Sequence, residues 1–180
     1  MAKQHIIKSG EYAGKTIEQL ALIDYPYFLS RRKFLFEKAK KGDKGDCRFW
    51  PEVNAMDKLN DILNSSLKEE KCDTPECDSL ANRIWVPYNI IRNGHTREDY
   101  NFNLYELHCV AHWAEGQFKR FSLDFNSIAK LYAKKDRDKM QSILLKLSGF
   151  YQDNSKRRKT VKEAYKFFDY LKNGRTKELF

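Results

Sequence analysis

Apolar residues recur at helical spacing over most of the chain. Thr16 has the properties of a helix N-cap, and the apolar residues that follow it lie three or four positions apart. A second helix is predicted to begin at Tyr25-Pro26, and a third at Pro51, because proline is favoured in the first turn of a helix. The third helix is expected to end near Glu70. Further helices with one apolar face are predicted over residues 125–132, 140–147 and 161–171.

The middle of the chain has the alternating, aromatic and β-branched pattern that is typical of strands. Residues 83–86 and 102–107 are the two strand candidates, and residues 92–95 (RNGH) form the turn predicted between them. Residues 5–8 (HIIK) are a shorter strand candidate. The pattern predicts an α+β fold that is mainly helical, with a small N-terminal strand-turn-helix element and a central β-hairpin.

Changes in composition predict three regions. A charged, glycine-containing loop at residues 40–46 is the first boundary. We therefore expect residues 1–45 to form the strand and helix element, residues 46–118 to hold a helix and the β-hairpin, and residues 119–180 to form a basic helical region. The net charge of the chain is +9 and is distributed unevenly: residues 1–48 carry +5, residues 49–118 carry −6, and residues 119–180 carry +10.

The two basic regions favour contact with a nucleic-acid backbone, which binds lysine and arginine with release of counterions. No apolar run approaches the roughly 18 residues of a membrane span. The N-terminus lacks the apolar stretch of a secretory signal. We therefore expect a cytoplasmic protein with no membrane partner. In that reducing compartment, cysteine pairs are expected to bind metal rather than to form disulfides.

Four soft ligands lie in two close pairs. Cys72 and Cys77 have the spacing C-x4-C, Cys109 and His112 have the spacing C-x2-H, and 31 residues separate the pairs. Such pairs predict a tetrahedral Zn²⁺ site made of three thiolates and one imidazole. With the hairpin between the two pairs, the middle of the chain resembles a zinc ribbon. Four protein ligands leave no open coordination position, so the predicted site is structural rather than catalytic.

Two other residues are alternative ligands. His108 is adjacent to Cys109, but neighbouring side chains of a strand point to opposite faces, and the C-x2 spacing favours His112. Cys47 lies 25 residues before Cys72 and is interpreted as a structural residue or as one without a role. Buried free thiols, or disulfides in an exported protein, are the alternatives to metal binding.

Two short motifs follow the N-terminal strand candidate in order: residues 10–17 (GEYAGKTI) and residues 24–29 (DYPYFL). Through them, residues 5–37 resemble the small C-terminal element of exonuclease X-like proteins. Glu11 replaces the usual lysine of that pattern, and Ser9 replaces the usual aromatic residue. The resemblance implies an accessory element beside nucleic-acid enzymes, without catalytic residues of its own.

Candidate nucleic-acid-binding residues combine positive charge with aromatic neighbours, a composition suited to backbone contact and base stacking. They lie in the glycine-containing turn, in the second helix, and in the basic linker before the last helix. They are Tyr12, Lys15, Arg31, Arg32, Lys33, Lys156, Arg157, Arg158 and Lys159. Lys15 precedes a helix N-terminus, which by itself is a modest phosphate-binding position.

These features predict a zinc-stabilised, non-catalytic nucleic-acid-binding protein that acts as a subunit or accessory factor of a larger nucleoprotein complex. DNA and RNA are both open as ligands. The alternative is a zinc-finger-framed nuclease of the histidine–metal type, in which His95 or His108 activates water and Asp99 or Glu106 holds a second metal. No second histidine or asparagine stands at the required spacing, which favours the non-catalytic protein.

Overall fold

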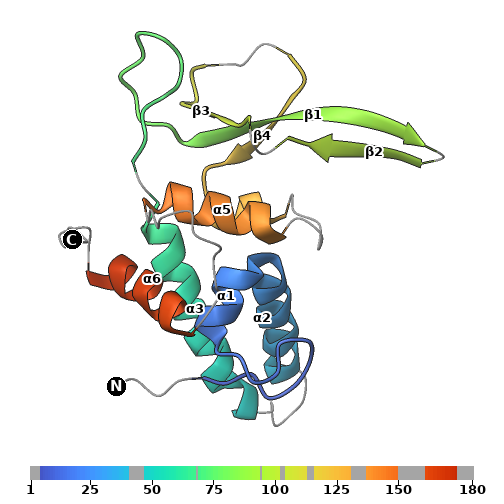
Figure 1. Cartoon of the computed structure of the whole chain (residues 1–180), viewed down its shortest axis with the longest axis vertical. Coiled ribbons are helices and arrows are strands. Elements are labelled where there is room, and N and C mark those ends of the chain that lie inside the picture. The colour runs from blue at the N-terminus through green and yellow to red at the C-terminus, as the bar shows by residue number, and fades with distance from the viewer. Residues whose placement is uncertain are drawn as a thin grey trace. The chain divides into compact units, whose positions relative to one another are not determined.

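The computed structural model describes residues 5–40, 47–67, 69–93, 95–101, 104–112, 116–130, 137–149 and 161–173. The chain divides into two compact units (Figure 1): unit 1 contains Met1–Leu67 and Tyr132–Phe180, and unit 2 contains Lys68–Leu131. The described helices and the antiparallel sheet confirm the predicted α+β fold. The division differs from the three predicted regions, because the first and last parts of the chain pack into one helical unit.

Unit 1 starts with a glycine-containing turn where a strand was expected at residues 5–8. Ile6 forms an isolated β-bridge with Thr16 instead of a strand ladder. The chain turns at Gly10, whose φ is 94°, and a Cβ on this residue would lie 3.2 Å from the hydroxyl of Tyr27. Both the backbone conformation and the available space therefore favour glycine here, and the early turn limits the predicted strand to one bridge.

Helix α1 (Ile17–Ile23) begins at the predicted N-cap. The side-chain oxygen of Thr16 accepts a hydrogen bond from the amide of Gln19 at 3.2 Å, and the side-chain oxygen of Gln19 accepts one from the amide of Thr16 at 3.0 Å. This reciprocal capping box satisfies two amides of the first turn that have no partner within the helix. The prediction of Thr16 as the N-cap is confirmed.

Helices α2 (Tyr25–Lys40) and α3 (Trp50–Ser65) pack against each other. A short 3-10 turn, η1 (Cys47–Phe49), precedes α3. Both predicted starts are confirmed, and Pro51 lies in the first turn of α3, but α3 ends before the predicted position near Glu70. The apolar faces of the two helices are buried through Tyr25, Phe28, Leu35, Val53, Met56, Leu59 and Leu63.

Helices α5 (Arg137–Leu147) and α6 (Val161–Asn173) complete unit 1, and both contact α1. Their inward residues follow the predicted apolar faces. The buried members are Met140, Ile143, Leu144, Leu147, Ala164, Phe167 and Phe168. Among the described residues, no helix has the length and the apolar composition that crossing a membrane requires.

Unit 2 contains an antiparallel sheet of four strands: β1 (Arg83–Asn93), β2 (His95–Tyr100), β3 (Glu106–His108) and β4 (Phe118–Ser122). The central strand is β1. Its first half pairs with β3 and β4, and its second half pairs with β2, ending at the pair Asn93 and His95. A short helix, α4 (Phe125–Ala129), follows β4 and is capped by Asp124, whose carboxylate accepts the amide of Ser127 at 2.7 Å.

The hairpin reverses where the Asn-Gly turn was predicted, but its second strand is not the predicted one. β2 starts at His95. Of the predicted strand over residues 102–107, residues 102 and 103 lie outside the described residues, and the described part is a strand only in β3, which pairs with residues 83–85. β4 lies in a region that was expected to be helical after Gly116. A four-stranded sheet therefore takes the place of the simple ribbon hairpin.

Candidate metal centre

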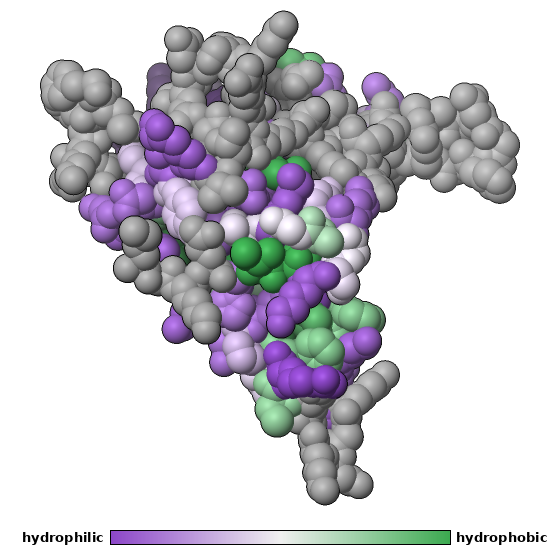
Figure 2. Space-filling model, turned by 60° about the horizontal axis from the view of Figure 1, so that its bottom comes forward, coloured by the Kyte–Doolittle hydropathy of each residue, from purple (hydrophilic) through white to green (hydrophobic). Residues whose placement is uncertain are grey.

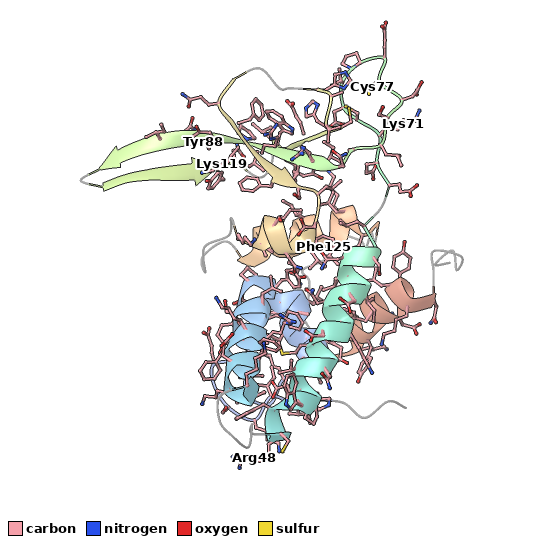
Figure 3. The ribbon with its side chains drawn as sticks, turned by 180° about the vertical axis from the view of Figure 1, so that it is seen from behind. Arg48, Lys71, Cys77, Tyr88, Lys119 and Phe125 are labelled. Atoms are coloured by element: carbon pink, nitrogen blue, oxygen red, sulfur yellow. The ribbon has the colours of Figure 1, made fainter. Side chains whose placement is uncertain are left out.

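Two turns at one end of β1 and β3 position the predicted metal ligands. Cys72 and Cys77 belong to the loop that precedes β1 (Figure 3), and Cys109 and His112 belong to the turn that follows β3. The first loop closes on itself, since the amide of Cys72 donates to the carbonyl of Ser79 at 3.0 Å and the amide of Cys77 donates to the carbonyl of Thr74 at 3.1 Å. In the second turn, the amide of His112 faces the carbonyl of Cys109 at 3.4 Å.

The four predicted ligands converge. Their ligand atoms all lie within 4.8 Å of one another. The Nδ1 atom of His112 lies 3.4 Å from Sγ of Cys72 and 3.2 Å from Sγ of Cys109. A tetrahedral ion with bonds of ~2.3 Å to sulfur and ~2.0 Å to nitrogen has sulfur–nitrogen edges of about 3.5 Å. The cluster therefore has nearly the size that a tetrahedral metal ion requires, and it could hold one.

The two ligand turns are joined by backbone hydrogen bonds to Asp73. The amide of Asp73 donates to the carbonyl of Leu107 at 2.7 Å, and Oδ2 of Asp73 accepts the amide of Leu107 at 2.5 Å. The amide of Cys109 also donates to the sulfur of Cys72 at 3.4 Å. These contacts fix the position of the first turn relative to β3 and bring residues 37 positions apart in the chain into one site.

His108 lies beside the cluster but does not belong to its four ligands. Its Nδ1 atom lies 3.8 Å from Sγ of Cys72 and 3.2 Å from the hydroxyl of Thr74, and its Nε2 atom lies 2.9 Å from a carboxylate oxygen of Glu106. Only 5% of His108 is exposed. His108 and Cys109 were expected to point to opposite faces of one strand. Cys109 follows the end of β3, so this alternation does not apply, and both residues lie near Cys72. His108 is placed as a hydrogen-bonding neighbour of Cys72.

The local electrostatics favour a thiolate at Cys72. Burial by itself would raise the pKa of this thiol, but hydrogen bonds from Thr74, from the amide of Cys109 and from His112 lower it to about 5. At Cys109 the amide of Ala111 lowers the pKa, yet burial and the neighbouring sulfurs outweigh it, so the pKa of Cys109 is raised. Without a cation, a thiolate at Cys72 therefore opposes the deprotonation of Cys109. A bound metal ion would compensate the negative charges of both sulfurs.

Sequence reasoning identified the four residues that the structure brings together and missed two residues that support the cluster. Asp73 and Thr74 hold the first turn and contact β3 through Leu107 and His108. The available signal was the polar pair directly after Cys72, because Asp and Thr side chains commonly bond nearby backbone groups in turns. The alternative ligand Cys47 is exposed, lies in η1 of unit 1, and is not a member of the cluster.

The predicted nucleic-acid-binding residues are not equally accessible. Tyr12 is only 5% exposed, and its hydroxyl donates to a carboxylate oxygen of Asp24 at 2.7 Å, so its ring belongs to the core. Lys15 is half-buried and Lys33 is exposed. The basic residues Lys156, Arg157, Arg158 and Lys159 lie outside the described residues.

Two predicted arginines of α2 pair with α3. Arg31 forms an ion pair with Glu52 at 2.8 Å, the side chains being 11% and 19% exposed, and it also donates to the carbonyl of Ser9 at 3.2 Å. Arg32 forms an ion pair with Asp57. Both arginines therefore connect elements within unit 1.

No family model, curated protein or solved structure matches this chain. The resemblance of residues 5–37 to the exonuclease X-like element stays a prediction.

Proposed function

We propose that the chain is a zinc-stabilised, non-catalytic nucleic-acid-binding protein and an accessory subunit of a larger nucleoprotein complex. The observation that carries the proposal is the convergence of Cys72, Cys77, Cys109 and His112, with all ligand atoms within 4.8 Å. Three thiolates and one imidazole form a ligand set that suits Zn²⁺ in tetrahedral coordination. Four protein ligands complete this shell, so the metal would stabilise unit 2 without activating water.

The charge distribution supports nucleic acid as the partner. Unit 1 carries 26 Lys/Arg and 15 Asp/Glu, a net charge of +11, whereas unit 2 carries 8 and 10, a net charge of −2. A polyanion is therefore attracted to unit 1 and not to the metal-binding unit. The near-neutral surface of unit 2 is available for a protein partner of the complex. In this proposal the metal maintains the fold of one unit, and the other unit binds the nucleic acid.

The surroundings of His108 argue against the histidine–metal nuclease. A histidine that activates water must reach solvent and substrate, but His108 is buried. Its two ring nitrogens already face Cys72, Thr74 and Glu106. A nuclease in which His108 activates water is therefore the weaker of the two functions, and the side chain of His95 lies outside the described residues.

Metal analysis tests the zinc part of the proposal. Purified wild-type chain is expected to contain about one zinc per molecule, and Cys72→Ser and Cys109→Ser are expected to lose it. Cys47→Ser is the matched control, because this cysteine is exposed and lies outside the cluster. A wild-type chain without zinc, or three variants with equal zinc content, would contradict the assignment.

A binding assay tests the nucleic-acid part separately. Fluorescence anisotropy with labelled DNA and RNA oligonucleotides is expected to give an affinity that falls steeply between 50 and 200 mM salt. Magnesium should cause no cleavage of either oligonucleotide. Absence of binding at low salt would refute nucleic-acid binding, and magnesium-dependent cleavage lost in His108→Ala would support the nuclease instead.

A further inference from the structure

Helix α2 presents lysines that form no ion pair with any residue the structure describes. Of its five basic residues, Arg31 and Arg32 pair with α3. The other three, Lys33, Lys38 and Lys40, are exposed and form no ion pair within the part of the chain that the structure describes. Glu37 is the one acidic residue of this helix. The outer side of α2 is therefore a basic surface in the more basic of the two units.

Aromatic rings accompany these lysines. Phe34 is 56% exposed, and the ammonium of Lys38 lies 4.6 Å from the centre of its ring. The ammonium of Lys40 lies 4.3 Å from the centre of the Phe36 ring. Such cation–aromatic contacts hold the lysine side chains close to the helix.

Figure 2 shows hydrophobic residues lying directly beside hydrophilic ones on the side of the molecule that it views. An exposed ring that carries a lysine ammonium 4.6 Å from its centre, on a helix with two further exposed lysines and one exposed glutamate, does not suit an apolar protein partner, which would have to bury these charges. It suits a ligand that combines phosphates with flat aromatic groups. Unpaired nucleotides have both properties, whereas the bases of a duplex are stacked on one another and do not offer their faces.

We infer that the α2 surface, defined as Lys33, Phe34, Lys38 and Lys40, binds single-stranded nucleic acid. Phe34 stacks on an unpaired base, and the three lysines contact the phosphates on either side of it. This inference rests on the proposed function and adds to it the form of the nucleic acid and the residues that bind it. It replaces Arg31 and Arg32, which the sequence had favoured, with neighbours that pair with no carboxylate in the described part of the chain.

The experiment measures binding of the full-length chain to a labelled 15-nucleotide single strand and to the duplex of the same sequence. Phe34→Ala is expected to weaken single-strand binding by roughly 5- to 150-fold, the effect of losing one stacked base. Ile6→Ala is the matched control, because Ile6 is an exposed apolar residue of the same unit at 55% exposure. Phe34→Trp, which keeps a ring for stacking, is expected to retain the wild-type affinity.

The lysines are tested through the salt dependence. Lys38→Gln combined with Lys40→Gln should reduce the slope of log K against log salt by about 1.4, the value for two phosphate contacts on a single strand. Lys58→Gln is the control, since Lys58 is an exposed lysine of α3. Circular dichroism and zinc content identify any variant that has lost its fold.

The outcomes separate the inference from the proposed function. A wild-type chain that binds neither oligonucleotide overturns both. A chain that binds nucleic acid while Phe34→Ala and Ile6→Ala behave alike overturns the inference alone, and so does a preference for the duplex. Selective loss of single-strand binding in Phe34→Ala, with rescue in Phe34→Trp, establishes the site.

Discussion

The backbone amide of Leu107 donates a hydrogen bond to Oδ2 of Asp73, and the amide of Asp73 donates one to the carbonyl of Leu107. This two-way contact joins the turn that holds Cys72 to the strand that leads into Cys109. It is not itself part of the metal centre. It joins the two halves of the candidate centre through hydrogen bonds that involve no metal.

We expect Asp73→Ala to weaken both the fold of unit 2 and its metal affinity. The substitution leaves the amide of Leu107 without its side-chain acceptor, and an unsatisfied buried amide costs about 1–3 kcal/mol. The free energy of unfolding should fall by that amount, as measured by denaturant titration of the zinc-loaded chain. A competition assay with a zinc-binding dye should show a lower affinity in the same variant.

Asp78→Ala is the matched control for this loop. Asp78 pairs with Lys71 at 2.7 Å, but the two side chains are 93% and 70% exposed, and such pairs contribute at most about 1 kcal/mol. It should therefore behave like the wild-type chain. Equal effects of the two substitutions would show that the loop responds to lost negative charge and not to the contact with Leu107.

Glu76 gives a second prediction for the same loop. Its φ of 64° places it in the left-handed region, where a residue with a Cβ is strained and a β-branched residue more so. Glu76→Val should therefore destabilise the loop by about 1–2 kcal/mol, while Glu76→Gly should leave the stability equal or higher. Thermal unfolding of the zinc-loaded variants measures both. A glycine variant less stable than the valine variant would contradict the conformation of this turn.

The sequence predicted well those features that depend on residues close in the chain. The N-cap at Thr16, the starts of α2 and α3, and the two ligand pairs each occupy only a few consecutive positions. β2 was missed because its sequence, HTREDY, has no apolar alternation and becomes a strand only by pairing with β1. Local pattern carries no information about such a pairing.

The exposure of surface residues also depends on contacts that the local sequence does not show. Arg31 and Tyr12 have the types expected at a nucleic-acid surface, yet their partners Glu52 and Asp24 lie 21 and 12 positions away. Whether a charged or aromatic side chain is buried against a partner depends on contacts between elements that are distant in the sequence. The Cys/His cluster could be predicted because two close pairs of metal-binding residues are visible in the sequence, and binding one ion requires the pairs to come together.

Removal of the metal should affect the two units differently. Binding energy at a structural zinc site is also folding energy, so a strong chelator should destabilise the sheet that connects the ligand turns. Hydrogen exchange of the buried amides of β1 around Ile84 and Val86 should accelerate by orders of magnitude. The amides of α3 around Met56 and Leu63, in the unit without the cluster, should keep their protection.

The cysteine variants provide the control for chelation. Cys72→Ser should exchange like the chelated wild type with or without chelator, and Cys47→Ser should behave like the wild type. Unchanged exchange in β1 after complete zinc removal would show that the sheet folds without the metal. Equal acceleration in α3 would show that the two units unfold together.

The final prediction concerns the role of Arg31. Its guanidinium pairs with Glu52 in a largely buried position and also donates to the carbonyl of Ser9, so it connects α2 to α3 and to the N-terminal turn. Arg31→Gln should lower the free energy of unfolding by about 1–3 kcal/mol, because it leaves the largely buried carboxylate of Glu52 without its charged partner. A double-mutant cycle with Glu52→Gln should recover part of this loss, since the second substitution removes the unpaired charge.

The same variant separates a structural role from ligand binding. If Arg31 acts only within the fold, Arg31→Gln should bind oligonucleotides with the wild-type affinity and the wild-type salt slope at temperatures where it is fully folded. The exposed neighbour Lys33 is the comparison, because Lys33→Gln should change the salt slope and leave the stability nearly unaltered. A loss of affinity in Arg31→Gln without a loss of stability would show that Arg31 contacts the nucleic acid, as the sequence predicted.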